Sequence, residues 1–402
     1  MSNIMKVLDG YDFSKADVIS LGSLMKRIKE RGKDDPSVEQ VYVVSNTQGI
    51  VRAEDFRENT IHSEDTSNYT IIRKNMIAYN PSRLNIGSIA MLNSEMPGLV
   101  SPMYVVFRID ENKIQKEYFE YLIKSKHILS KIEAYKEEGA RFRFDFNRWN
   151  WIKIPLPPLD VQKRIVEILN AFKKGIQGVE EELRLRNIQY DYYRNKVLRE
   201  IGGESVKVID ICDDIFLGLT AKVDYVEEGG IPLVRANNMT SGVLTFDDVK
   251  CISEEQHEKL TKTHKAQKGD ILISKSGTLG AVCVVDTDKE FSIYESLICL
   301  HPKKHVFNRY LLHLLRSQDV QEIMLEKKVG NAIKHLNIQT FRKLYISLPS
   351  YEEQIRISKM LDAFEELCNM PDRGLVAEID MRESQFNYYQ NLIMGLSDVK
   401  EV

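Results

Sequence analysis

Ile154-Pro-Leu-Pro-Pro-Leu-Asp-Val-Gln162 opens a helical pattern that runs without a further proline to Ile201. Adjacent prolines cannot lie inside a helix, so they fix where it begins, and the Asp160 carboxylate suits the positive end of the helix dipole. From Ile165 on, positions spaced alternately four and three apart are apolar or aromatic, with one exception, Arg186. This heptad spacing predicts a coiled-coil helix, roughly 60 Å long from Leu159 to Ile201.

The same stretch occurs again 192 residues later, as Ile346-Ser-Leu-Pro-Ser-Tyr-Glu-Glu-Gln354. Matching residues continue along the second helix, but the offset later becomes 196, so the second copy holds four extra residues around Pro371. Four residues inserted into a heptad pattern make a stutter, and a proline among them predicts a kink or a break. The arginine in the apolar seam recurs as Arg382, opposite Arg186 in the alignment, and a polar residue there usually fixes register.

The repeat divides the chain into a first globule, a central helix, a second globule and a C-terminal helix. We expect these segments to span residues 1–158, 159–201, 202–350 and 351–402. Two helices with matching seams most simply pack together, which predicts an antiparallel coiled coil and a pseudo-twofold internal repeat. Both globules mix helical and strand patterns without a long parallel-sheet signal, so the fold class is mixed α+β. In the first globule, residues 18–31 are predicted to form a short helix.

Composition is that of an ordinary soluble globular protein, with 43% hydrophobic and 29% charged residues and a net charge of −3. No run of 18 apolar residues suggests a membrane span. The five cysteines are widely separated and form no Cys-x-x-Cys pair, which indicates unpaired thiols and a cytoplasmic location. Neither globule is strongly basic, so any DNA binding must depend on local clusters. The C-terminal segment 351–402 has five basic against 11 acidic residues and looks like a protein-docking surface.

Catalytic motifs are not convincing anywhere in the sequence. Asn80-Pro-Ser-Arg83 lacks the second proline and the aromatic residue of the amino-methyltransferase motif. The glycine-rich segment 276–280 lacks the Lys-Ser/Thr ending of a P-loop and is better explained as a hairpin turn. Pro302 argues against a helix that would present His301 and His305 to one metal ion. We therefore predict no catalytic residue, no bound cofactor and no metal site in this chain.

Side chains suited to reading base edges gather instead in the loops between strands and before the long helices. Arginine and lysine suit guanine, asparagine suits adenine, and hydroxyl groups suit either. The candidates for DNA contact are Ser45, Asn46, Arg83, Asn85, Arg141 and Arg143 in the first globule, and Arg235, Asn237, Asn238, Lys275, Ser276, Thr278, Asn331 and Lys334 in the second. The competing interpretation is structural, because such residues also serve turn geometry. Arg141 and Arg143 could likewise be the exposed side of a strand whose buried side is Phe142, Phe144 and Phe146.

These features together resemble the specificity (S) subunit of a type I restriction–modification system. The resemblance covers nearly the whole chain, and its strongest signature is Ile-x-Leu-Pro-x-x-x-x-Gln followed by a long helix, present twice. The segments Lys268-Gly-Asp-Ile-Leu-Ile-Ser-Lys-Ser-Gly-Thr278 and Leu233-Val-Arg-Ala-Asn-Asn238 are also similar to target-recognition domains of that family. The first globule departs from this pattern at Lys74-Asn-Met-Ile-Ala-Tyr-Asn-Pro81, which suggests a divergent subtype of recognition domain.

The resemblance implies a non-catalytic, sequence-specific DNA-binding protein of host defence. Each globule, as a target-recognition domain, would read one half of a bipartite site in double-stranded DNA, and the helices would act as a spacer ruler and as a dock. The partners would be two methyltransferase (M) subunits, which bind S-adenosylmethionine, and restriction (R) motor–nuclease subunits, which use ATP and Mg. Two alternatives remain open: the recognition part of a fused DNA methyltransferase or nuclease, and a coiled-coil structural adaptor without DNA readout.

Overall fold

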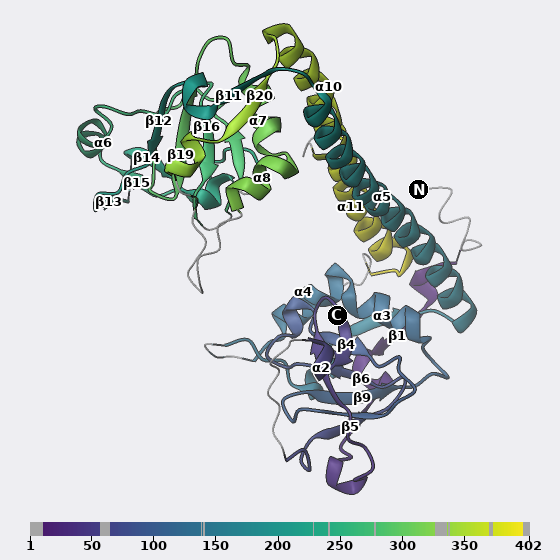
Figure 1. Ribbon diagram of the computed structural model, residues 1–402. Coiled ribbons are helices and arrows are strands. Elements are labelled where there is room, and N and C mark those ends of the chain that lie inside the picture. Colours follow the sequence, from purple (N-terminus) through teal and green to yellow (C-terminus); the bar gives the residue numbers. More distant parts are fainter. Residues whose placement is uncertain are drawn as a thin grey trace. The chain divides into compact units, whose positions relative to one another are not determined.

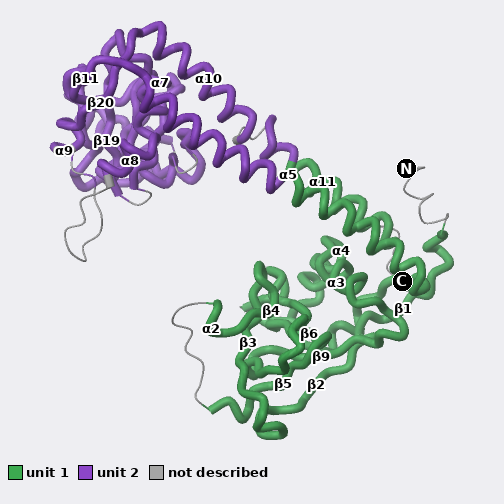
Figure 2. Tube along the Cα trace, turned by 45° about the vertical axis from the view of Figure 1, so that its right-hand side comes forward, with its two compact units in different colours: residues 1–179, 379–402 green, residues 180–378 purple. Residues whose placement is uncertain are grey.

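The chain forms two compact units, each with its own core and a share of the long helices (Figures 1 and 2). Unit 1 comprises residues 1–179 and 379–402, and unit 2 comprises residues 180–378. The computed structural model describes residues 11–56, 65–137, 139, 141–227, 229–239, 242–276, 279–325, 336, 338–369 and 373–396. Among these residues, no helix combines the length and the apolar composition that crossing a membrane requires.

Unit 1 is built on two four-stranded sheets, in the orders β2-β9-β6-β7 and β4-β3-β8-β5. Only the β3–β8 pair is parallel. The strands are β1 (Asp17–Ser20), β2 (Met25–Ile28), β3 (Val41–Ser45), β4 (Gly49–Arg52), β5 (Thr70–Ile72), β6 (Ile77–Tyr79), β7 (Ile89–Met91), β8 (Gly98–Val100), β9 (Val105–Ile109) and β10 (Lys153–Leu156). The helices before the long one are α2 (Ala53–Phe56), α3 (Lys116–Lys124) and α4 (Lys126–Ala134), and β1 pairs with β10.

Unit 2 repeats the topology of the first sheet, in the order β12-β19-β16-β17, whereas its second sheet, β13-β15-β14-β18, has its fourth strand at the opposite edge. Its single parallel pair, β14–β18, matches β3–β8. The strands are β11 (Glu204–Lys207), β12 (Cys212–Leu217), β13 (Tyr225–Val226), β14 (Ile231–Val234), β15 (Cys251–Ile252), β16 (Ile271–Ser274), β17 (Val282–Val284), β18 (Ser292–Ile293), β19 (Leu297–Pro302) and β20 (Tyr345–Leu348). The helices are α6 (Glu254–Leu260), α7 (Asn308–Leu315), α8 (Gln318–Leu325) and α9 (Ile338–Arg342), and β11 pairs with β20.

The long helices are divided between the units. Helix α5 spans Leu159–Glu200, α10 spans Tyr351–Asn369 and α11 spans Leu375–Ile393. The predicted helix is therefore confirmed, and so is the break in the second copy, although Pro371 itself lies outside the described residues. Residues 159–179 of α5 belong to unit 1 with most of α11, whereas residues 180–200 belong to unit 2 with α10.

Equivalent aromatic pairs hold the helices together in each unit. In unit 1, Phe172 of α5 stacks on Tyr389 of α11, with ring centroids 5.5 Å apart. In unit 2, Tyr193 of α5 meets Phe364 of α10 at 6.2 Å. Within unit 1 the two helices run antiparallel: Phe172 lies beside Tyr389, and Gly175, further along α5, lies beside Arg382, which is earlier in α11. The antiparallel coiled-coil pairing and the internal repeat predicted from the heptads are thus confirmed at the level of side chains.

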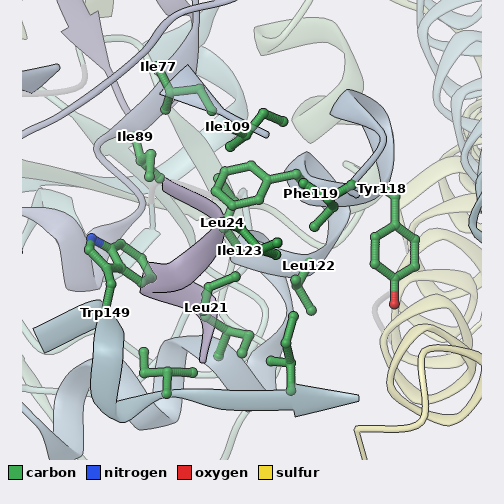
Figure 3. Close-up of a cluster of buried hydrophobic side chains, with 14 of the residues drawn as sticks. Leu21, Leu24, Ile77, Ile89, Ile109, Tyr118, Phe119, Leu122, Ile123 and Trp149 are labelled. Carbon is green, nitrogen blue, oxygen red and sulfur yellow. The ribbon is translucent and has the colours of Figure 1, made fainter. Parts of the chain in front are cut away.

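Each globule packs its main sheet, its short helices and its share of the long helices into one hydrophobic core. In unit 1, Trp149, Phe119 and Leu21 are completely buried together (Figure 3). Ile165 of α5 and Ile393 of α11 belong to the same cluster. The corresponding cluster in unit 2 includes Phe341, Tyr190, Leu198, Ile357 and Leu361. The long helices are therefore part of both cores rather than linkers.

The repeated glutamine of the Leu-Pro-x-x-x-x-Gln signature has a structural role in both units. The buried Gln162 accepts the Gln115 N–H at 2.8 Å, and its Nε2 donates to the carbonyl oxygens of Lys113 at 2.9 Å and Pro157 at 2.8 Å. Gln354 repeats the pattern with the Phe307 N–H at 2.7 Å and the carbonyls of His305 and Pro349. Each glutamine therefore ties the first turn of a long helix to the loop that precedes α3 or α7.

Replacing Gln162 with alanine should lower the free energy of unfolding by about 2 kcal/mol, because it leaves three backbone groups, the buried Pro157 carbonyl among them, without partners. The expected result is a clear drop in melting temperature, measured by thermal denaturation. Alanine at the neighbouring exposed Lys163 is the matched control and should change stability little. Equal effects of the two substitutions would contradict the structural role of the glutamine.

One local prediction and one competing interpretation were wrong. Residues 18–31 form β1, a short 3₁₀ turn and β2 instead of a helix, because Leu21 and Leu24 are buried by tertiary packing that overrides the local apolar spacing. The run around Phe142, Phe144 and Phe146 is not a strand. It is an extended segment that enters a 3₁₀ helix at Phe146–Trp151, and of the three phenylalanines only Phe144 is fully buried.

Candidate nucleic-acid interface

Three chain segments meet at the same edge of the main sheet in each unit. Tyr79 at the end of β6 pairs with Val105 at the start of β9, and Ser274 at the end of β16 pairs with Leu297 at the start of β19. Antiparallel pairing therefore brings the loop after β6 or β16 beside the loop before β9 or β19. The two sites are built from equivalent parts of the repeat.

The third segment is the stretch that precedes β10 in unit 1 and β20 in unit 2. In unit 1 the Phe144 N–H donates to the Pro81 carbonyl at 2.9 Å. In unit 2 the Leu336 N–H donates to the Lys275 carbonyl at 3.2 Å. Phe144 and Leu336 are both buried and lie 192 residues apart, the offset of the sequence repeat. The same backbone hydrogen bond thus anchors this segment against the loop in both units.

In unit 1 these segments enclose a pocket of about 540 Å³ with a strongly basic lining. Arg83 and Arg143, two of the residues predicted from the sequence, line it together with Arg27 from β2. The one carboxylate in the lining, Asp145, already accepts the Asn147 N–H at 2.8 Å. Arg143 also lies 3.7 Å from Glu137, but three guanidinium groups against one carboxylate leave the lining positive, which favours an anionic ligand such as a phosphate or a guanine edge.

Hydrogen bonds of buried side chains fix the loop that carries Arg83. The largely buried Asn80 accepts the Ser82 N–H on its side-chain oxygen at 2.9 Å, which makes a turn of the Asx type. The Tyr79 hydroxyl donates to the Phe144 carbonyl at 3.3 Å, and burial raises the pKa of Tyr79, so this tyrosine stays neutral. A fixed loop presents the arginine without a large loss of conformational entropy on binding.

In unit 2 the equivalent loops converge on Ser296. Its carbonyl accepts the Lys275 N–H at 2.8 Å, and its hydroxyl accepts the Ala236 N–H at 3.3 Å. The Arg235 guanidinium lies over the rings of Tyr294, at 4.6 Å, and Tyr225, at 5.4 Å, and it donates to the Tyr225 hydroxyl. The structure therefore brings together Arg235 and Lys275, which the sequence analysis had named separately.

The remaining predicted residues fall into three groups. Ser45 and Asn238 are buried and bond within their own loops: Ser45 Oγ accepts the Gln48 N–H at 3.2 Å, and Asn238 accepts the Arg235 N–H at 3.0 Å. The exposed candidates that do not line the unit 1 pocket or join the loops around Ser296 are Asn46, Asn85, Arg141 and Asn237, and Ser276 is half-buried beside Lys275. Thr278, Asn331 and Lys334 lie outside the described residues.

Several residues of these surfaces were not predicted from the sequence. Arg27 was hidden by the wrong assignment of residues 18–31 to a helix. The sequence-based candidates were hydrogen-bonding side chains in loops, so they did not include Tyr225, Tyr294 and Lys250. The Lys250 ammonium lies 4.8 Å from the centroid of the Tyr225 ring. Interleaved aromatic and basic residues at strand ends are the signal that could have revealed them, since the faces of aromatic rings orient guanidinium groups.

Ionisable clusters elsewhere in the described residues have structural partners. His313, Asp362 and Glu365 present donor atoms within 4.8 Å of one another, but the two carboxylates already bond Arg309 and Arg316. Burial raises the pKa of the Cys299 thiol, which donates to Asp270, so this cysteine is a poor nucleophile. His301, one of the two histidines weighed as metal ligands, bonds Asp270 at 2.6 Å.

Comparison with known proteins gives the family. The family model of the type I restriction modification DNA specificity domain matches twice, at residues 17–185 and 204–380. A putative type I restriction enzyme specificity subunit of Haemophilus influenzae is 30% identical over 265 residues, which are 61% of this chain and 64% of that protein. The EcoR124I/EcoR124II specificity subunit of Escherichia coli is 26% identical over 307 residues, which are 73% of this chain and 74% of that protein.

The fold has a solved counterpart. A chain from a structural study of complex assembly and conformational transition of the type I restriction–modification system covers 96% of this chain and 99% of its own length, with a TM-score of 0.67 at 18% identity. The two family matches correspond to the two repeats, and each contains the three-segment edge described above. The chain belongs to the type I restriction–modification DNA specificity family and carries two copies of its specificity domain.

Proposed function

We propose that the chain is the specificity subunit of a type I restriction–modification complex and that each unit reads one half of a bipartite site in double-stranded DNA. The observation that carries this proposal is the recurrence of the three-segment edge, once in each unit. In unit 1 it presents Arg27, Arg83 and Arg143, and in unit 2 it presents Arg235 and Lys275. Because the two sets differ in chemistry, the two half-sites differ in sequence.

The helices serve as ruler and dock in this proposal. Helix α5 is a single helix of 42 residues that contributes to both units, so its length can set the unread spacer between the half-sites. Exposed apolar side chains at helical spacing support docking: Leu185, Ile188 and Tyr192 are each more than half exposed on α5 in unit 2. Met381 and Tyr388 occupy matching positions on α11 in unit 1 and are equally exposed. A twofold-repeated apolar surface suits two copies of one partner.

Catalysis belongs to the partners. Two methyltransferase subunits would bring S-adenosylmethionine, and motor–nuclease subunits would bring ATP and Mg. The specificity subunit would supply recognition and would act in the cytoplasm, where those partners are made. The family assignment and the existence of solved type I assemblies with a chain of this fold support the proposal.

Domain exchange provides the test. Residues 202–345 are replaced with the corresponding domain of another specificity subunit, and bound sites are selected from random duplexes in the presence of the methyltransferase subunit. We expect one half-site to change while the other half-site and the spacer stay the same. A change in both half-sites would refute modular reading, and recovery of no bipartite motif would favour a structural adaptor. Binding of S-adenosylmethionine by the chain alone, measured by calorimetry, would favour a fused enzyme.

A further inference from the structure

Because of the internal repeat, the same junction between a short helix and a long helix occurs once in each unit. In unit 1, Tyr121 of α3 bonds Asn170 of α5, with the hydroxyl 2.6 Å from the amide oxygen. In unit 2, His313 of α7 bonds Asp362 of α10, with Nε2 2.7 Å from the carboxylate oxygen. Each pair is separated from its counterpart by 192 residues. The two junctions therefore have a hydrogen bond between equivalent positions, although the side chains differ.

In unit 2 the junction is closed by the chain's own carboxylates. Arg309 donates to Asp362 and lies 3.2 Å from Glu365, and Arg316 bonds Glu365 at 2.7 Å. The His313 imidazole is fully buried beneath them. In the second repeat, this junction therefore holds two carboxylates of α10 that pair with cationic side chains of the neighbouring helix.

In unit 1 Asn170 and Lys173 stand where unit 2 has its two carboxylates. At the offset of 192 residues, Arg316 corresponds to Lys124, and Arg309 corresponds to Glu117, so a carboxylate occupies one of the two arginine positions. Lys124, Lys173 and the adjacent Lys174 line a pocket of about 340 Å³, together with Glu117, Glu120, Tyr121, Asn170 and Gln177. Among the described residues, none of the three lysines has a carboxylate within salt-bridge distance. The three lysines gather here without a carboxylate in ion-pair contact, although Glu117 and Glu120 lie in the same lining.

We propose that this lysine pocket, lined by Lys124, Lys173 and Lys174, receives a carboxylate from an acidic segment of the methyltransferase partner. The partner's side chain takes the place that Glu365 fills in unit 2. The inference rests on the proposed function, and it makes the two docking positions unequal: the lysines of unit 1 would pair with a carboxylate in trans, whereas the arginines of unit 2 pair with carboxylates of their own chain.

The lining favours a protein over DNA as the source of the anion. Glu117 and Glu120 lie in the same pocket and would repel a phosphodiester backbone, but they can pair with basic side chains at the rim of a protein interface. The pocket also lies on helices α3 and α5, and none of its lining residues lines the basic pocket of Arg27, Arg83 and Arg143.

The test uses the full-length chain and its methyltransferase subunit. Substituting Lys173→Glu rebuilds the unit 2 arrangement, because the new carboxylate can pair with Lys124. We expect affinity for the methyltransferase subunit to fall at least tenfold at low salt, while the melting temperature of the free chain stays the same or rises. Lys33→Glu, an exposed change elsewhere in unit 1, is the matched control and should leave the affinity within twofold of the wild type.

A second measurement needs no variant. Lys124, Lys173 and Lys174 should become protected from acetylation when the wild-type complex forms. Equal affinities of wild type and K173E, with no protection, would overturn the inference alone. A loss of DNA affinity in K173E with unchanged affinity for the methyltransferase subunit would assign the pocket to a phosphate and overturn it as well. Failure of the wild-type chain to bind the methyltransferase subunit would remove the docking function itself, and the inference with it.

Discussion

Replacing Arg83 and Arg143 with alanine should abolish readout of one half-site and lower affinity for the bipartite site by about 100-fold. Both guanidinium groups line the basic pocket of unit 1, whose single carboxylate is already hydrogen-bonded. A well-made arginine contact to a guanine edge discriminates by about 1–3 kcal/mol, so two lost contacts amount to roughly 3 kcal/mol or more. The specificity of the other half-site should be unaffected, because unit 2 has its own core and its own loops.

Fluorescence anisotropy on the selected duplex, over a series of salt concentrations, measures this effect. Arg108→Ala is the matched control, because Arg108 is exposed on β9 of the same sheet but does not line the pocket. A double variant that binds as tightly as the control would remove the pocket from the DNA interface. An affinity loss that is equal for specific and random duplexes would assign the two arginines to phosphate contacts rather than base readout.

The sequence revealed the repeat because its signature is built on backbone chemistry. The Leu-Pro dipeptide ends a strand, and Gln162 and Gln354 satisfy backbone groups that water cannot reach, so these residue types recur at the same spacing. Gly87 and Gly280 both adopt positive φ values, 84° and 81°, at the turns before β7 and β17. Such constraints act on short stretches of the chain, so they leave recognisable patterns in the sequence.

What the sequence could not show depends on tertiary contacts. The apolar spacing of residues 18–31 is compatible with a helix. Part of this stretch nevertheless forms strand β2, because it pairs with β9, a strand about 80 residues away in the sequence. Arg27 reaches the basic pocket only through that pairing. Asn238 was a plausible base reader by composition, but its amide closes the loop that positions Arg235. Loop residues that build a site and those that contact a ligand share the same composition, so only the folded geometry separates them.

The polar junction between α7 and α10 should be the most sensitive point for the stability of unit 2. Asp362→Ala leaves the buried His313 without its carboxylate and removes a partner of Arg309, so the free energy of unfolding should fall by about 3 kcal/mol. Asn170→Ala in unit 1 is the matched control: it removes only the Tyr121 hydrogen bond at the equivalent position and should cost about 1 kcal/mol. Hydrogen exchange of α7 and α10 in the full-length chain measures the loss unit by unit.

The same junction should make unit 2 sensitive to mild acid. Burial lowers the pKa of His313, and a neutral imidazole satisfies both neighbours, because Nδ1 can accept from Tyr190 at 3.0 Å while Nε2–H donates to Asp362. Burial opposes ionisation of Asp362, but hydrogen bonds from His313 and Arg309 outweigh it and lower the pKa of Asp362, so the carboxylate keeps its charge.

As the pH falls below about 6.5, His313 becomes protonated in the unfolded chain but stays neutral in the folded chain, because folding lowers its pKa. Stability of unit 2 should therefore decrease from that pH down to the lowered folded pKa, and exchange in α7 should accelerate there. Exchange in α3 of unit 1, where Tyr121 replaces the histidine, should not accelerate over the same range. Parallel acceleration in both helices would show that the acid sensitivity does not come from His313.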